Sequence, residues 1–317
     1  MLSPAQLSSS NQLPRPVQEP VITDVVVVPL RGNDLVPDEW LGGAAVELLP
    51  GLTLERFEDA EAVIEACMSR GLHFDPARQF GELYSFVRRS LPSEPFYTFD
   101  SDHVMQDALG LSRLVQVNPH CTQYAARIID GSRADGERVI APLPAPDRFY
   151  AYVPPTEQAH LDVSQAHELG SLLDRFHAGR HGLPERVRNA LWSCEYAARE
   201  YFRELASVQV ASGLEALIKT EMRSATDQFA TRVAGMAADL GIAGVDAKLL
   251  RGFYAERSGQ VHGDPRPVEN ETEANHRLGL VHSVLRAAIR RAIEDGDYAA
   301  VFAGPESIQR RYPWRRR

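Results

Sequence analysis

Residues 249–265 read LLRGFYAERSGQVHGDP, and this stretch decides how the second half of the chain folds. Apolar residues at helical spacing lead up to His262, and Gly263 and Pro265 follow it. Glycine readily takes the left-handed C′ conformation that closes a helix, and proline cannot continue one. We therefore predict a helix over 246–262, with His262 on its last turn.

The two residues that carry the chemistry of this stretch are Arg257 and His262. Five residues at about 100° each place them roughly 140° apart around the helix axis, with a rise of about 7.5 Å. The two side chains therefore do not share a face, whereas Ser258 and His262 do. A guanidinium that swings across the gap, or a second copy of the helix, could complete a phosphate-sized site. Alternatively, both cations only complement the negative end of the helix dipole.

The sequence around this stretch resembles a known protein family. Tyr254, Arg257-Ser258 and Val261-His262-Gly263 are preceded at a distance by the stretch GLEALI over 213–218. This combination is similar to the ApeA-like branch of the HEPN superfamily, whose helical domains carry an arginine, four to six residues, and then a histidine. The local form here is Arg-x4-His. The resemblance covers roughly residues 165–300.

The resemblance implies a metal-independent endoribonuclease that acts as a homodimer, often in phage defence or a toxin–antitoxin system. Only Arg257, Ser258 and His262 match the motif itself. The position after the arginine is often Asn, Asp or His in catalytic members, and Ser258 is the smaller form found in ApeA-like sequences. No metal or other cofactor is implied.

The chemistry of the two residues agrees with that activity. The fork of Arg257 matches a phosphodiester and neutralises the charge that builds up as the phosphorus becomes five-coordinate. A histidine such as His262 can take and give a proton near neutrality. Together they suffice to let the 2′-hydroxyl of RNA attack phosphorus and expel the 5′-oxygen. Tyr254 and Glu215 are candidate supporting residues, Glu215 either as a buried partner of Arg257 or as an exposed residue.

Composition restricts the class of protein. The chain has 317 residues, is 44% apolar and carries a net charge of −9, which argues against a generic basic coat for nucleic acid and leaves RNA contact to a local patch. Cys67, Cys121 and Cys194 lack metal-ligand spacing and suit a reducing cytoplasm. No export signal or membrane-spanning run is present. We expect a cytoplasmic protein.

The first half of the chain predicts a mixed α/β domain, so the whole chain is expected to be α+β. A flexible leader over 1–20 precedes this domain, which spans 21–155, and proline-rich sequence near 155–165 marks its end. The expected strands cover 25–28, 52–57, 138–140 and 148–153, and the expected helices cover 59–70, 80–91 and 103–117.

The second half predicts an all-α antiparallel bundle, the HEPN-like domain at 160–300. A basic tail at 301–317 follows, and its last residues, 310–317, are either solvated or able to grip nucleic acid through five arginines and two aromatic residues. The expected helices cover about 165–180, 184–206, 207–222, 224–240, 246–262 and 271–296.

Other catalytic patterns are weak or missing. His160, His167, His177 and His181 cluster in sequence without an H-E-x-x-H arrangement, so no metal site is expected. No phosphate-binding glycine loop or nucleophile elbow is present. Two rival hypotheses remain. One is a catalytically inactive HEPN module that binds RNA or a protein, and the other is a toxin-like subunit held silent by a regulatory partner.

Overall fold

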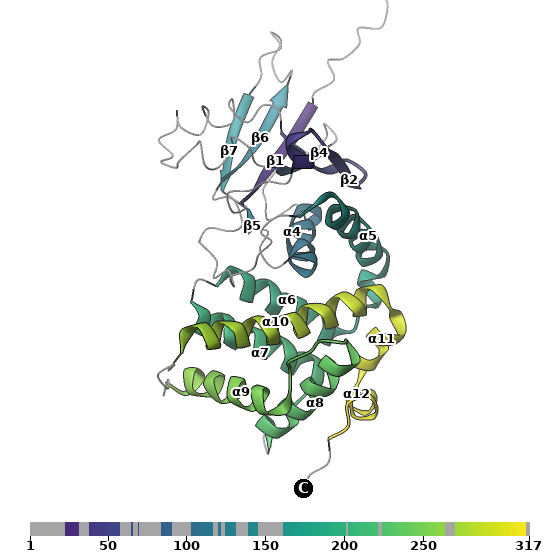
Figure 1. The fold of residues 1–317 in the computed structure, drawn as a ribbon. Helices are drawn as coiled ribbons and strands as arrows, with labels where there is room; N and C mark the ends of the chain where they lie inside the picture. Colours follow the sequence, from purple (N-terminus) through teal and green to yellow (C-terminus); the bar gives the residue numbers. More distant parts are fainter. Residues whose placement is uncertain are drawn as a thin grey trace, which may run out of the picture.

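The computed structural model describes the greater part of the chain, and the fold is α+β. A small antiparallel sheet at one end is followed by a larger helical bundle (Figure 1). The residues described are 23–31, 38–57, 65, 69, 84–90, 103–116, 120–121, 124–130, 139–144, 161–200, 202–220, 224–263 and 270–314.

The sheet is antiparallel throughout, in the order β2-β3-β4-β1-β6-β7, with β5 paired to β1. It confirms the strands predicted near 25–28, 52–57 and 138–140, while β2, β5 and β6 were not predicted. The strands are β1 (Thr23–Arg31), β2 (Ala45–Leu49), β3 (Leu52–Arg56), β4 (Tyr84–Ser90), β5 (His120–Cys121), β6 (Tyr124–Asp130) and β7 (Val139–Pro144).

The helix predicted over 80–91 is wrong, because β4 occupies residues 84–90. This strand lies inside the sheet, between β1 and β3, and residues 84–87 are all buried. A strand covered on both faces shows no alternation of polar and apolar residues. Its apolar positions can then fit a helical period by accident, and the pairing of neighbouring strands decides the outcome.

Two helices, α4 (His103–Val115) and α5 (Val163–Gly179), lie between the sheet and the other helices (Figure 1). The predicted helix over 103–117 is therefore confirmed. Leu161 joins the two halves: its carbonyl accepts from Trp40 Nε1 at 2.7 Å, and its N–H donates to the Tyr84 hydroxyl at 2.8 Å. The rings of Trp40 and Tyr84 stack with centroids 5.2 Å apart.

The bundle confirms the predicted helices, but the break expected at 206–207 comes earlier: one helix ends at Arg199, and the next runs from Arg203 to Ile218 where 207–222 was expected. Within the described part of 161–314 no strand occurs. No helix in the described ranges is long and apolar enough to cross a membrane. The helices are α6 (Glu185–Arg199), α7 (Arg203–Ile218), α8 (Ala225–Asp239), α9 (Ala247–His262) and α10 (Glu271–Glu294).

At Gly213 the helix α7 lies very close to α10 and α6. A Cβ atom at Gly213 would lie 2.8 Å from Leu285 Cδ2 and 3.1 Å from Ser193 Cβ. Leu285 is fully buried, so its side chain has little room to move. The glycine in the stretch 213–218 therefore sets the distance between these helices.

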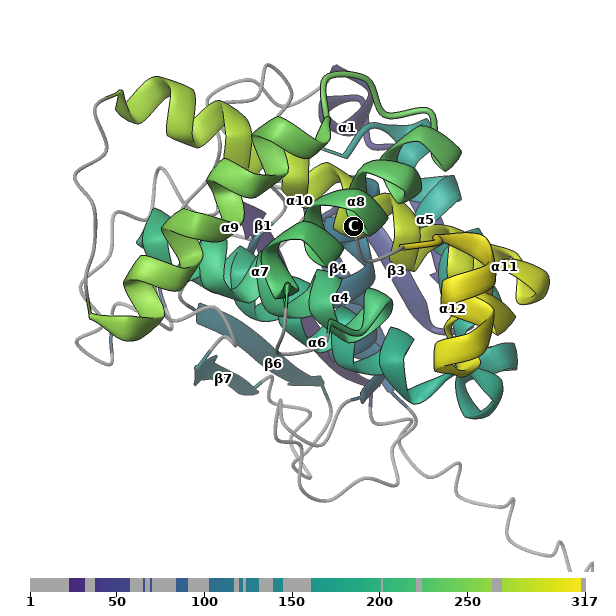
Figure 2. The ribbon, with the colours of Figure 1, turned by 90° about the horizontal axis from the view of Figure 1, so that it is seen from below.

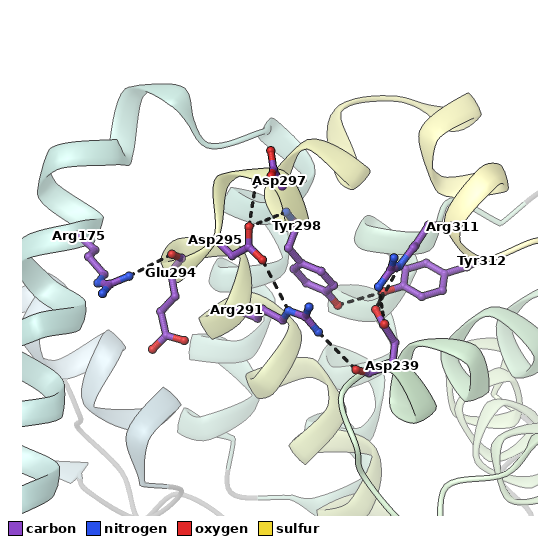
Figure 3. Close-up of polar contacts among 9 residues, drawn as sticks. All are labelled: Arg175, Asp239, Arg291, Glu294, Asp295, Asp297, Tyr298, Arg311 and Tyr312. Atoms are coloured by element: carbon purple, nitrogen blue, oxygen red, sulfur yellow. Dashed lines mark hydrogen bonds and ion pairs between the residues drawn. The ribbon is translucent and has the colours of Figure 1, made fainter.

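The basic tail expected over 301–317 is folded onto the bundle in the part that the structure describes, up to residue 314. After α11 (Gly296–Ala300) and a short 3-10 turn, α12 (Pro305–Arg311) packs on the bundle, with Ile308 and Tyr312 buried. Asp239 at the end of α8 accepts from Arg311 and from the Tyr312 hydroxyl, which also contacts the Tyr298 hydroxyl at 3.1 Å (Figure 3). The end of the chain is thereby fixed to α8.

Other predicted features lie outside the described residues. These are the leader over 1–20, the strand over 148–153, most of the boundary near 155–165, and the helix over 59–70 apart from Glu65 and Ser69.

The close approach at Gly213 predicts opposite effects of alanine at two helical glycines. Gly213→Ala must push Leu285 or Ser193 away and should lower the free energy of unfolding, by up to about 1–3 kcal/mol. Gly279→Ala in α10 meets nothing within 4 Å and should raise it by about 0.5–1 kcal/mol. Urea unfolding of both variants tests this, and equal stabilisation by the two alanines would contradict the packing.

Candidate functional site

Helix α9 places the predicted catalytic pair as the sequence indicated. Its first turn is capped by Asp246, whose side chain accepts from Leu249 N at 2.8 Å. Gly263 has φ 74° and ψ 22°, and its N–H bonds back to the last turn. The prediction that this glycine closes the helix directly after His262 is confirmed. Arg257 and His262 therefore lie on the C-terminal half of one helix.

The centre of the candidate site is the carboxylate of Glu215 on α7. Its Oε2 accepts from Arg257 Nη2 at 2.9 Å, and its Oε1 accepts from the Tyr254 hydroxyl at 2.6 Å. Thr220 Oγ1, just beyond the end of α7, donates to the same Oε1 at 3.3 Å. The sequence left open whether Glu215 is a buried partner of Arg257 or an exposed residue. In the structure it is the partner of Arg257, and its side chain is 20% exposed.

The guanidinium of Arg257 is fixed in place, but not all of its N–H donors are used. Its guanidinium lies over the Tyr254 ring, 5.4 Å from the ring centroid, and its side chain is 20% exposed. Its Nε is buried and has no acceptor among the described residues. An arginine carries five N–H donors, so the single bond to Glu215 leaves donors for an anionic ligand.

His262 and Ser258 lie apart from this cluster. His262 is exposed, Ser258 is half-buried, and neither side chain has a hydrogen-bond partner among the described residues. One α9 helix therefore brings Arg257, Tyr254 and Glu215 together and leaves His262 about 140° away around the axis from Arg257.

Tyr254 is fixed as a neutral hydrogen-bond donor. Burial, followed by the hydrogen bond to Glu215 and its negative charge, raises the pKa of Tyr254 to about 12. Its ring packs against Phe229 of α8, with centroids 4.7 Å apart. Tyr254 thus orients the carboxylate and supports Arg257, and its high pKa makes it a poor general base near neutrality.

The histidine cluster that could have suggested a metal has other contacts. His177 Nε2 lies 3.1 Å from Asp107 Oδ2 of α4, and Arg180 Nη1 donates to the same oxygen at 3.1 Å. His181 is exposed, and His160 lies outside the described residues. In the described ranges no group of three or more His, Cys, Asp or Glu side chains has the arrangement of a metal site.

One pair that sequence reasoning missed is Cys194 of α6 with His282 of α10, whose Sγ and Nε2 lie 3.5 Å apart. Burial raises the pKa of Cys194 to about 12 and lowers that of His282 to about 3. The thiol stays protonated and the imidazole stays neutral, so this dyad cannot supply a thiolate nucleophile near pH 7. The sequence separation of the two residues gave no signal for the pair.

The raised pKa of Tyr254 predicts a pH dependence of stability. Its folded pKa of about 12 exceeds the ordinary 10.0, so the stabilisation is fully present below pH 10 and is lost as pH rises towards about 12. The free energy of unfolding of Tyr254→Phe should therefore fall less than that of the wild type over this interval. Urea unfolding across the interval measures the difference, and identical slopes for the two proteins would refute it.

Comparison with known proteins gives no match for this chain: no family model, no curated protein and no solved structure matches it. The resemblance of residues 165–300 to the HEPN superfamily therefore stays a hypothesis. It rests on Arg257, Ser258 and His262.

Proposed function

We propose that this chain is a cytoplasmic, metal-independent endoribonuclease of the HEPN type, with Arg257 and His262 as its catalytic residues. The observation that carries the proposal is the placement of both on the closing turns of α9, where Arg257 is oriented by Glu215 and His262 faces solvent. The proposed setting is phage defence or a toxin-type system with a regulatory protein.

Each residue would have a defined part in the reaction. His262 would take the proton of the 2′-hydroxyl, or deliver one to the 5′-oxygen that leaves when the 2′-oxygen attacks phosphorus. Arg257 would bind the phosphodiester and neutralise the charge that grows on its oxygens. Glu215 and Tyr254 would position the guanidinium, and Ser258, which shares the face of His262, would contact the substrate.

The geometry also supports assembly through α9. Arg257 and His262 face different directions on one helix, so a two-fold pairing would bring the arginine of one copy near the histidine of the other. Val261, next to His262, is 52% exposed and offers apolar surface for such a contact. The proposed active form is therefore a homodimer with a shared site.

A specific observation favours the second candidate, a catalytically inactive module that binds RNA or a protein. Arg257 already carries a carboxylate partner, Glu215, at 2.9 Å, and this ion pair lowers the net positive charge offered to a phosphate. Under this alternative the pair would stabilise the bundle, and RNA would bind without being cut.

Cleavage assays separate the two candidates. Wild-type protein should cut RNA in excess chelator and leave 2′,3′-cyclic or 3′-phosphate ends, and RNA with 2′-deoxy positions at the cleaved bonds should resist. His262→Ala should reduce the rate by about 10²–10⁴-fold, and Arg257→Lys should also be impaired because it loses the two-pronged fork. His181→Ala, also exposed, is the matched control and should leave the rate unchanged. Chelator-sensitive cleavage with 3′-hydroxyl ends would discard this mechanism, and inert wild-type protein that binds RNA would favour the inactive module.

A mixing experiment tests the shared site. Arg257→Ala and His262→Ala subunits, each inactive alone, should regain activity when they are unfolded together and refolded as mixed dimers, because one site in each mixed dimer keeps both residues. Dimerisation is measured by light scattering at the same concentration. Activity that never recovers in proven mixed dimers would place each Arg257 and His262 in a site within one subunit.

A further inference from the structure

A cavity of about 600 Å³ lies where the end of α7 meets α12. Lys219, Arg232, Gln309, Arg310 and Trp314 line it, with Glu306 as the carboxylate at its wall. This volume lies within the range of sites that hold small molecules or single nucleotides. Its lining thus combines three cationic residues with a tryptophan.

A buried arginine builds the frame of this cavity. Arg232 of α8 is 9% exposed and donates to the carbonyls of Ile218 at 2.8 Å and Lys219 at 2.6 Å. It thereby caps the last turn of α7. The same guanidinium donates to Gln309 Oε1 at 2.6 Å, and Gln309 Nε2 donates to the Trp314 carbonyl at 2.8 Å. One side chain thus fixes α7, α12 and the tryptophan relative to each other.

The opposite side of α12 is anchored independently, by Asp239. Arg311 and the Tyr312 hydroxyl both bind this carboxylate, and Arg291 Nη1 donates to its main-chain carbonyl at 3.3 Å (Figure 3). The wall that carries Arg310 and Trp314 is therefore in place before any ligand binds. A preformed wall lowers the entropic cost of binding.

The cations at the rim are available to an anion. Lys219 and Arg310 are both exposed, and neither side chain makes an ion pair with a described residue, whereas the adjacent Arg311 is paired with Asp239. Lys219 has φ 49°, a backbone conformation that side-chain-bearing residues rarely adopt, so the chain turns sharply just where the lysine meets the cavity. On a protein of net charge −9, these cations make a local positive site.

Trp314 adds a surface for stacking. It is partly exposed, and its backbone is held at both N and O by Gln309. A positive groove with an aromatic ring on which a base can stack is the usual arrangement for single-stranded nucleic acid. Three more arginines, Arg315–Arg317, follow directly in the sequence.

The cavity and the candidate active site meet at consecutive residues. Lys219 lines the cavity, and Thr220 donates to Glu215, the partner of Arg257. Helix α8 lies between α9 and α12 at the end of the bundle away from the sheet, in both views (Figures 1 and 2). A strand of nucleic acid that lies across this end would reach both places.

We propose that this cavity binds one nucleotide of a single-stranded RNA, with Trp314 stacked on the base and with Lys219 and Arg310 on the adjacent phosphates, while a flanking segment of the same strand lies at α9. The choice of RNA rests on the proposed function. The cavity itself is a binding subsite, and it holds the substrate without taking part in bond cleavage.

The test uses full-length His262→Ala protein, which should not cut, and a fluorescent oligouridine of about 16 nucleotides, the upper site size of one single-strand-binding module. Adding Trp314→Ala should weaken binding by about 5- to 150-fold. Adding Lys219→Ala or Arg310→Ala should weaken it and reduce the slope of log K against log salt by about 0.7 each. Trp192→Ala and Lys248→Ala, both at exposed residues, are the matched controls and should bind like the parent.

Two results would overturn the subsite. One is that the Trp314, Lys219 and Arg310 variants bind the oligouridine as tightly as the control variants do. The other is competition by duplex RNA as strong as that by the single strand, because a paired base cannot stack on the indole. In protein that keeps His262, Trp314→Ala should raise KM for long RNA and leave kcat unchanged. Cleavage of a dinucleotide, which is too short to reach the cavity, should be the same with and without Trp314→Ala.

The failure of the subsite is distinguishable from the failure of the proposed nuclease. Wild-type protein that leaves RNA intact but binds it through Trp314 would discard the nuclease and retain the subsite. Cleavage by wild-type protein together with Trp314-independent binding would discard the subsite alone.

Discussion

The close approach of α7 to α10 at Gly213 is the constraint on which the arrangement of the bundle depends. No side chain fits between the two helices there, since a Cβ atom at Gly213 would lie 2.8 Å from Leu285 Cδ2. Glu215 lies two residues later on α7, and Lys219, six residues after Gly213, is the residue that caps the end of this helix. The carboxylate that binds Arg257 and the lysine that lines the cavity beside α12 therefore both lie near the C-terminal end of α7.

The Glu215–Arg257 pair gives the candidate site a balance between orientation and charge. The carboxylate fixes the guanidinium against the Tyr254 ring, which lowers the conformational freedom that a phosphate would otherwise have to remove. It also cancels part of the positive charge, and at partial burial this electrostatic effect is stronger than in water. An anion that binds Arg257 must therefore share the guanidinium with Glu215, using the donors that the carboxylate leaves open.

Sequence patterns predicted the helical half far better than the sheet half. The closing of α9 at His262 followed from Gly263 and Pro265, since helix ends depend on local conformational rules. Strand β4 could not be predicted, because its pairing with β1 and β3 makes it a strand and its burial removes the alternation of polar and apolar residues that marks one. The Arg257 partner was foreseen only as one alternative, since a contact between α7 and α9 depends on tertiary packing. The frame of Arg232, Gln309 and Trp314 joins α8 and the end of α7 to the segment 309–314, more than 70 residues away in the sequence, so no local pattern indicated it.

Helix α5 packs against both the sheet and the helical bundle. A Cβ atom at Gly170, in the middle of α5, would lie 3.3 Å from the Leu48 carbonyl oxygen of β2. Five residues later, Arg175 donates to the Glu294 carbonyl of α10. Loss of the sheet would expose one face of α4 and α5 to solvent, and loss of α10 would expose the opposite face. We therefore expect heat or denaturant to unfold the described sheet and the bundle together, in one cooperative transition.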